Sequence, residues 1–240
     1  MSTIAAHGNI SLHAEPVAHW WHTALLFAFF LLLTLSGIIF QRQAGAQAGA
    51  PPQHHNMVPL YLSLIAGQWG LLYYVWKGGL RRTETKLGEL IGKRYVGWKD
   101  VLLDALLGLG LWIVWMILQT AWNRWFGSGH AASIRFLLPQ RPVEVVLWIA
   151  LSISAGFCEE VIFRGYFQRQ FEALTRNVWI ALFLQSVLFG VSHGYQGVNA
   201  CLRITLYGGL FGLLALWRQS LRPCIAAHAL TDIVAGVVRL

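Results

Sequence analysis

The most regular feature of the chain is a series of long apolar segments separated by short polar ones. Between Glu15 and Arg42 there are 26 uncharged residues, and between Arg42 and Lys77 there are 34. A further 19 uncharged residues lie between Asp104 and Arg124. A membrane-spanning helix needs about 20 predominantly apolar residues to cross a hydrocarbon layer of about 30 Å. The pattern therefore predicts three spanning helices in the first half of the chain.

The second half continues the apolar series, but charged residues interrupt it. Its apolar blocks lie at about 143–163, 178–195, 199–217 and 221–238. The first apolar run of the chain is too long for a signal peptide, and no Lys or Arg precedes it. We therefore predict an all-α fold, a polytopic membrane helix bundle of about seven transmembrane helices in one membrane domain over residues 1–240.

Composition and charge support a membrane protein and argue against a nucleic-acid-binding one. Hydrophobic residues make up 56% of the chain and charged residues 12%, about half the charged share of a typical soluble domain. The net charge is +8, but the basic residues stand between apolar blocks and form no single stripe. This distribution favours contact with the anionic headgroups of the lipid bilayer and predicts no nucleic acid partner.

The positions of Lys and Arg also predict the orientation of the chain. Twelve basic residues fall in the segments 77–99, 164–176 and 218–222, and five fall at 42, 124–141 and 239. Because cytoplasmic loops carry the excess of Lys and Arg, we expect a cytoplasmic N-terminus and an outside C-terminus, in a cell (plasma) membrane. The segment 78–100 mixes apolar and basic residues, which is typical of a short amphipathic helix at the inner surface.

Three charged residues stand in one of the most apolar parts of the chain, in the stretch "FCEEVIFR" at 157–164. On a helix Glu160 and Arg164 are four residues apart and can pair on one face, whereas Glu159 is rotated from Glu160 by about 100°. One carboxylate would then be neutralised while the other is free to act as a general base. The simpler interpretation is that these charges mark the cytoplasmic end of a helix.

Two further pairs of polar residues four apart favour a functional site. The stretch "FGVSH" ends at His193, and "HALTD" contains His228 and Asp232. The other seven histidines, which include His22, lie in tails, loops or span ends, where we expect them to be solvated. Ionisable residues inside a membrane are costly, so they usually face a bundle interior or a wet cavity and serve function. We expect Glu159, His193 and His228 to converge on one polar cavity that opens toward the cytoplasmic side.

The motifs "EEVIFRG" at 159–165, "FGVSH" at 189–193 and "HALTD" at 228–232 together resemble those of the CPBP intramembrane proteases. This family comprises the type II CAAX prenyl endopeptidases, among them the Ras-converting endopeptidase, and the Abi-related proteins. The resemblance covers residues 143–236, which would form a CPBP-like catalytic core. Residues 1–142 form N-terminal helices without a recognised motif.

The resemblance implies a glutamate-dependent intramembrane endopeptidase that cleaves a membrane-anchored peptide or protein, a prenylated CAAX-type substrate being one class. Glu159 matches the catalytic glutamate, which with His193 would activate water. Glu160 and Arg164 match supporting members of the first motif. His228 and Asp232 match the motif that is thought to stabilise the oxyanion. Asp232 could donate to an oxyanion only if it is protonated, and otherwise it could orient His228.

Alternative functions remain open at this point. We expect no cofactor, but Glu159, His193 and His228 could instead ligate zinc with water in the fourth position, which would make the chain a metalloendopeptidase. A non-enzymatic transporter or scaffold protein is the other alternative, since intramembrane Glu, Arg and His can also form an ion relay. No inverted repeat or pair of broken helices points to a transporter.

Overall fold

The computed structural model describes residues 15–46, 56–92, 95–127 and 137–238, and these residues form helices and no strand. The helices are α1 (Trp20–Ala46), α2 (Val58–Tyr74), α3 (Leu87–Ile91), α4 (Trp98–Phe126), α6 (Pro142–Glu160), α7 (Gln168–Thr175), α8 (Val178–Ser192), α9 (Val198–Arg218) and α10 (Arg222–Val237). Short turns of other helix types join or extend them, namely η1 (Val75–Gly79), η2 (Leu80–Thr83), η3 (Val161–Phe167) and η4 (Gly194–Gln196).

The predicted all-α membrane bundle is confirmed, and the count of seven spans holds approximately. Five continuous helical segments are long and apolar enough to cross a membrane: 20–39, 58–83, 98–126, 142–175 and 198–218. The remaining two predicted spans correspond to α8 and α10, which have 15 and 16 residues and are shorter than a full crossing. The chain is therefore an integral membrane protein with a bundle of unequal helices.

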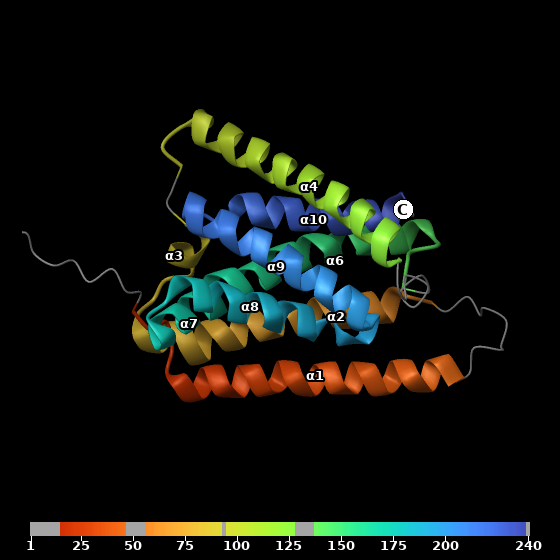
Figure 1. The fold of residues 1–240 in the computed structure, drawn as a ribbon, viewed down its shortest axis with the longest axis horizontal. Helices are drawn as coiled ribbons and strands as arrows, with labels where there is room; N and C mark the ends of the chain where they lie inside the picture. The colour runs from red at the N-terminus through yellow and green to blue at the C-terminus, as the bar shows by residue number, and fades with distance from the viewer. Residues whose placement is uncertain (1–14, 47–55, 93–94, 128–136, 239–240) are drawn as a thin grey trace, which may run out of the picture.

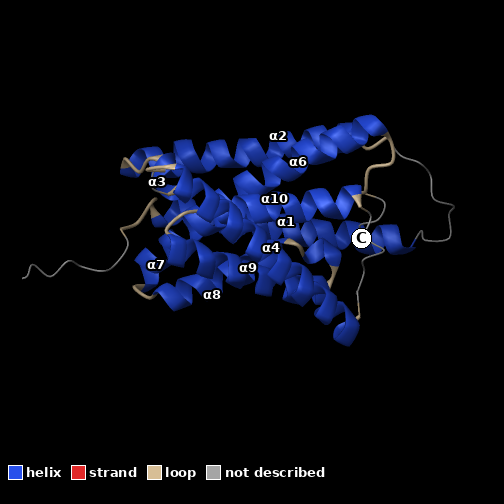
Figure 2. Cartoon of the chain, turned by 90° about the horizontal axis from the view of Figure 1, so that it is seen from above, coloured by secondary structure: helices blue, strands red, loops and turns tan. Residues whose placement is uncertain are grey.

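The helices run back and forth along one long axis (Figure 1). In that view α1 and α4 lie at opposite edges of the bundle, with α6, α8, α9 and α10 between them. Seen from above, α2 and α6 lie on one side and α7, α8 and α9 on the other (Figure 2). We call the end of the bundle that holds α3 and α7 the α3 end. The opposite end holds η4, and there α4 ends and α6 begins; we call it the η4 end.

Close approach of α6 to α10 depends on a glycine. A Cβ atom on Gly156 would lie 2.9 Å from the backbone nitrogen of Ala229 and 2.9 Å from the carbonyl oxygen of Ile225, closer than real Cβ contacts allow. Small residues at helix contacts let backbones approach closely, which is a major source of packing in membrane proteins. Gly156 lies one turn before Glu160, so this contact brings the acidic motif of α6 next to His228 on α10.

Polar contacts at the α3 end hold the start of α1 and the residues before it against the core. The Gln170 side chain accepts hydrogen bonds from the backbone nitrogens of Val17 and Ala18, at 2.9 and 3.1 Å, and donates to the Ala18 carbonyl at 2.8 Å. The ring of His22 lies 2.8 Å from the Tyr166 hydroxyl and is fully buried. The prediction that His22 is solvated is therefore wrong, because residues far along the chain fold over it.

The basic segment between α2 and α4 docks on the bundle more closely than an interfacial helix would. Its only regular α-helix among the described residues is α3, which has five residues. Leu90 is 1% exposed, and a Cβ on Gly165 would lie 3.2 Å from the Cβ of Leu90. The backbone nitrogen of Leu221 also donates to the Ile91 carbonyl at 2.8 Å. The segment therefore closes the α3 end of the core.

Candidate active site

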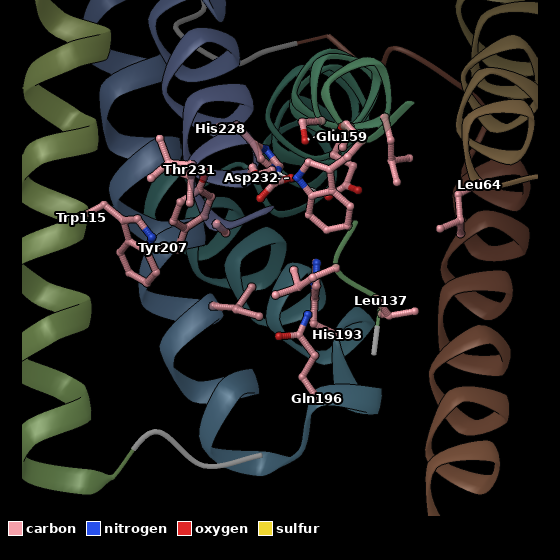
Figure 3. Close-up of a pocket in the computed structure, with 18 of the residues that line it drawn as sticks. Leu64, Trp115, Leu137, Glu159, His193, Gln196, Tyr207, His228, Thr231 and Asp232 are labelled. Carbon is pink, nitrogen blue, oxygen red and sulfur yellow. Dashed lines mark hydrogen bonds and ion pairs between the residues drawn. The ribbon is translucent and has the colours of Figure 1, made fainter. Parts of the chain in front are cut away.

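A cavity of about 350 Å³ opens inside the bundle beside the acidic motif. The predicted site residues Glu159, His193, His228 and Asp232 all line it, and they come from α6, the end of α8 and α10. Figure 3 shows these four side chains grouped around the same space. Tertiary packing thus brings together residues that are up to 73 positions apart in the sequence.

Glu160 and Arg164 form the ion pair that their spacing predicts. The Arg164 Nη1 atom lies 3.0 Å from Glu160 Oε1, and both side chains have no exposed surface. The helix does not stop after this pair, since η3 and α7 continue it to Thr175. The interpretation that these charges mark a helix end at the membrane surface is therefore wrong. Arg164 is further stabilised by the face of the Phe189 ring, 4.1 Å from its guanidinium carbon.

His228 completes this buried group in a way that the sequence did not predict. Its Nδ1 atom lies 2.8 Å from Glu160 Oε1, the same oxygen that binds Arg164. Because an ionised carboxylate only accepts hydrogen bonds, Nδ1 carries a proton and donates a hydrogen bond to Glu160. The ring is thereby fixed with Nε2 directed toward the cavity, the usual effect of a carboxylate behind an imidazole. Glu160, rather than Asp232, is the residue that orients His228 through Nδ1.

Glu159 has a different environment from its neighbour in the chain. Its side chain is 24% exposed, and its Oε2 atom lies 3.9 Å from His228 Nε2. Glu160, with no exposed side-chain surface, faces the packed interior. The rotation of about 100° between successive helical residues separates the two carboxylates. Glu159 is therefore the carboxylate of this pair that can reach a molecule in the cavity.

Asp232 lies on the cavity side of His228. Its Oδ2 atom is 3.6 Å from His228 Nε2, and its side chain is 38% exposed. The backbone carbonyl of Asp232 accepts a hydrogen bond from the Trp148 indole at 2.8 Å, which ties this turn of α10 to α6. Nε2 of His228 therefore faces two carboxylates, Glu159 and Asp232, on its open side.

His193 is held at the end of α8 with one ring nitrogen occupied. Its Nδ1 atom lies 2.8 Å from the Phe189 carbonyl oxygen, which can only accept a hydrogen bond. Nδ1 therefore donates, and Nε2 is left for another partner. The Phe189 ring packs against the His193 ring at 4.9 Å between centroids and also covers Arg164. One residue of the second motif thus links the two halves of the site.

Two cavity residues outside the three motifs were missed by the sequence analysis. Gln68 on α2 and Tyr207 on α9 both line the cavity. The Tyr207 ring lies 5.5 Å from the His228 ring, edge to face, and 3.8 Å from Phe211. A lone amide in an otherwise apolar span is the one signal that could have drawn attention to Gln68. Tyr207 has no such signal, since a tyrosine in a membrane helix is usually read as an interfacial residue.

The cavity opens at the end of the bundle opposite to the basic segments. Its lining extends from Glu159 to Tyr61 near the start of α2, to Leu137 before α6 and to Gln196 in η4, all toward the η4 end. The described basic residues of the segments 77–92 and 218–222 lie at the α3 end. A cytoplasmic N-terminus and a cytoplasmic opening of the cavity therefore cannot both hold. The two expectations conflict because Arg164, which was counted among the cytoplasmic residues, is buried and marks neither membrane surface.

A metal ion bound by the site side chains is the alternative to a metal-free site. Within the described parts of the chain, no group of three His, Cys, Asp or Glu side chains is arranged to hold one. The proposed zinc ligands Glu159, His193 and His228 line the same cavity, and Glu159 Oε2 lies 3.9 Å from His228 Nε2. As positioned, these side chains do not fit a zinc site, and metal dependence stays a prediction to be tested.

Comparison with known families agrees with this geometry. Residues 141–234 match the family model described as type II CAAX prenyl endopeptidase Rce1-like, so this segment is similar to that family. The description of that family model names an endopeptidase, a peptide hydrolase. The resemblance of the three motifs is thereby confirmed, and the match covers all of them. No curated protein and no solved structure shows significant similarity to the chain.

Proposed function

We propose that the chain is an intramembrane endopeptidase in which Glu159, assisted by His193, activates water to hydrolyse a peptide bond of a membrane-associated substrate. The observation that carries this proposal is the contrast between two adjacent carboxylates. Glu160 is fully buried and bound by Arg164 and His228, whereas Glu159 is partly exposed in a cavity that His193 also lines. A general base needs this combination of a reachable carboxylate and a fixed surrounding.

In the proposed mechanism each polar residue has a separate task. Glu159 takes a proton from water, and Nε2 of His193 accepts a hydrogen bond from the same water because its Nδ1 is occupied by Phe189. His228, doubly protonated between Glu160 and the cavity, donates from Nε2 to the oxyanion that forms on the scissile carbonyl. Asp232, 3.6 Å from that nitrogen, holds the ring in place. Glu159 then returns its proton to the leaving amine.

The family match and the place of the site support a membrane-associated substrate. The cavity lies among helices that are long and apolar enough to cross the membrane, which favours a peptide anchored in the bilayer as the substrate. A prenylated CAAX-type peptide fits this requirement, as does any membrane-anchored peptide with a flexible segment near the interface. We propose no cofactor for the reaction.

Cleavage by purified protein tests the proposal directly. In detergent, the wild type should cleave a membrane-anchored reporter peptide, and Glu159→Gln should lower the rate by about 100-fold or more, the usual contribution of a general base. Glu89→Gln, at an exposed carboxylate on α3, is the matched control and should keep wild-type activity. Full activity in Glu159→Gln would remove Glu159 from the mechanism. No cleavage of any anchored peptide by a folded wild type would favour a transporter or scaffold protein.

The orientation of the bundle is a separate part of the proposal. The excess of Lys and Arg at the α3 end favours a cytoplasmic N-terminus in the plasma membrane, with the cavity opening to the outside at the η4 end. Single cysteines at Gln196 and at Glu84 of a cysteine-free variant, labelled in intact cells with an impermeant maleimide, distinguish the two sides. Labelling at Gln196 alone is expected. Labelling at Glu84 alone would reverse the orientation and place the cavity on the cytoplasmic side.

A further inference from the structure

One intramembrane charge takes no part in the proposed mechanism. Arg203 lies five residues inside α9, about 8 Å from the helix start, in one of the five helical segments apolar enough to span the membrane. Arginine inside a membrane span is costly and is usually retained for a function, unless it reaches out to the headgroups. The Arg203 residue lines the same cavity as Glu159, so its charge faces the interior of the bundle.

The hydrogen bonds of Arg203 leave its charge without a counter-ion. Its Nη1 atom donates to Asn123 Oδ1 on α4 at 2.9 Å, a neutral acceptor that fixes the direction of the side chain. Its Nε atom is buried and has no hydrogen-bond partner. All ten Asp and Glu residues of the chain lie in the described segments, and none of them forms an ion pair with Arg203.

Arg164, a buried arginine with a structural role, has different surroundings from Arg203. Two of the buried donors of Arg164, Nε and Nη2, also have no hydrogen-bond partner, but its charge is neutralised by Glu160 and covered by Phe189 and Phe211. Arg203 has an amide in place of the carboxylate, and it borders empty space. The guanidinium fork is suited to bind a carboxylate through two parallel hydrogen bonds, and one donor on that fork is already desolvated and unused.

We propose that Arg203 forms a subsite for a carboxylate of the peptide substrate, a few residues from the scissile bond. This rests on the proposed endopeptidase function. Arg203 precedes Tyr207 by one helical turn, about 6 Å, and the Tyr207 ring borders His228. An extended peptide advances about 3.3 Å per residue, so the carboxylate would lie two to four residues from the bond that is cut. A free C-terminus or an Asp or Glu side chain at that distance supplies this chemistry.

A binding experiment with the inactive Glu159→Gln variant separates this subsite from catalysis. The probes are a fluorescein-labelled, S-farnesylated tetrapeptide with a free C-terminal carboxylate and the same peptide as its amide, measured by fluorescence polarisation in detergent. The acid should bind about tenfold or more tightly than the amide, the difference expected from a charge-assisted hydrogen bond. A second pair of amide peptides, with Asn or Asp as the last residue, tests whether a side-chain carboxylate can supply the same preference.

Substitution of the arginine should remove this preference and leave the rest of the binding intact. In the Glu159→Gln background, Arg203→Gln should bind acid and amide within twofold of each other, with the affinity for the amide unchanged. Arg203→Lys should keep part of the preference, because it keeps the charge and loses the fork. Arg124→Gln, at an exposed arginine near the same end of the bundle, is the matched control and should keep all of it. Thermal unfolding of each variant checks that it is folded.

Several results would overturn the subsite. Equal binding of all acid and amide probes by the parent, or saturable binding of none, excludes a carboxylate preference. Displacement of the acid peptide by phosphatidylglycerol micelles in the parent, and not in Arg203→Gln, would assign the cation to a lipid phosphate instead. The proposed endopeptidase function is judged separately, since it depends on cleavage by the wild type and its loss in Glu159→Gln.

Discussion

The segment from α1 to α4 and the segment from α6 to α10 both bury polar side chains, but they satisfy them differently. The described residues of the first segment contain four buried polar side chains, those of His22, Thr23, Thr34 and Asp104. Each contacts a partner in the second segment: Tyr166 for the first two, the Val191 carbonyl for Thr34 and Arg218 for Asp104. The first segment therefore depends on the second for its polar contacts.

The second segment pairs the charges of its acidic motif from within, and Arg203 is its exception, because its hydrogen bond goes to Asn123 on α4. Arg164 and His228 both bind Glu160, and the family match of residues 141–234 contains all three. Buried charges destabilise a protein unless they are paired and hydrogen-bonded, so this group requires that α6 and α10 be correctly packed. The difference indicates that α6 to α10 form the unit that builds the site, while α1 to α4 surround and close it.

The largest effect should come from breaking the buried group of the second segment. Glu160→Gln leaves the charge of Arg164 without a carboxylate and should lower the free energy of unfolding by about 3–5 kcal/mol. Thermal unfolding in detergent measures the loss, and Glu89→Gln at an exposed position is the control. The double variant Glu160→Met and Arg164→Met removes both charges, so it should regain much of the stability while remaining inactive, because His228 loses its orienting partner. A stable, active Glu160→Gln protein would contradict the conclusion that the buried group of α6 and α10 builds the site.

A smaller effect is expected from separating α6 and α10. Gly156→Ala places a Cβ 2.9 Å from the backbone of α10 and should cost about 1–3 kcal/mol of stability, with a marked loss of cleavage as the site widens. Gly110→Ala on α4 is the matched control in the first segment, since nothing lies within 4 Å of the new Cβ. It should be neutral or stabilise the protein by up to about 1 kcal/mol. Equal stability and equal cleavage by the two variants would show that neither depends on the close contact between α6 and α10.

Loosening the first segment should affect stability more than activity. Gln170→Ala removes the side chain that binds Val17 and Ala18 and leaves buried backbone groups unpaired, at a cost of about 1–3 kcal/mol. Cleavage by the folded fraction should stay within about threefold of wild type, because this contact lies at the α3 end, away from the cavity. Ser63→Ala, at an exposed serine on α2, is the control. An inactive but stable Gln170→Ala protein would mean that α1 has a part in catalysis.

The smallest effect should follow from chelation. If the polar groups of the site balance one another without a metal, a strong chelator leaves the cleavage rate of a purified, folded preparation unchanged. Elemental analysis of the same preparation should then find no stoichiometric zinc. Loss of activity that zinc restores, together with one zinc per chain, would make Glu159, His193 and His228 ligands and would require the site to rearrange on binding.

The sequence by itself determined the helices and much of the motif chemistry. Apolar runs of membrane-spanning length predicted the helices because the bilayer fixes the length of a span. The spacing of Glu160 and Arg164 predicted their pair because residues four apart share a helix face, and the three motifs indicated the family. These signals are local, or depend on residue order alone.

Only the tertiary structure decided which partners meet across helices. The bond between His228 and Glu160, the burial of His22, the side on which the cavity opens and the unpaired charge of Arg203 all depend on contacts between distant segments. Helical periodicity states which face a residue occupies, but it does not state which helix packs against that face. That choice is made by shape, as at Gly156, where the absence of a side chain lets α10 approach and brings His228 to the acidic motif.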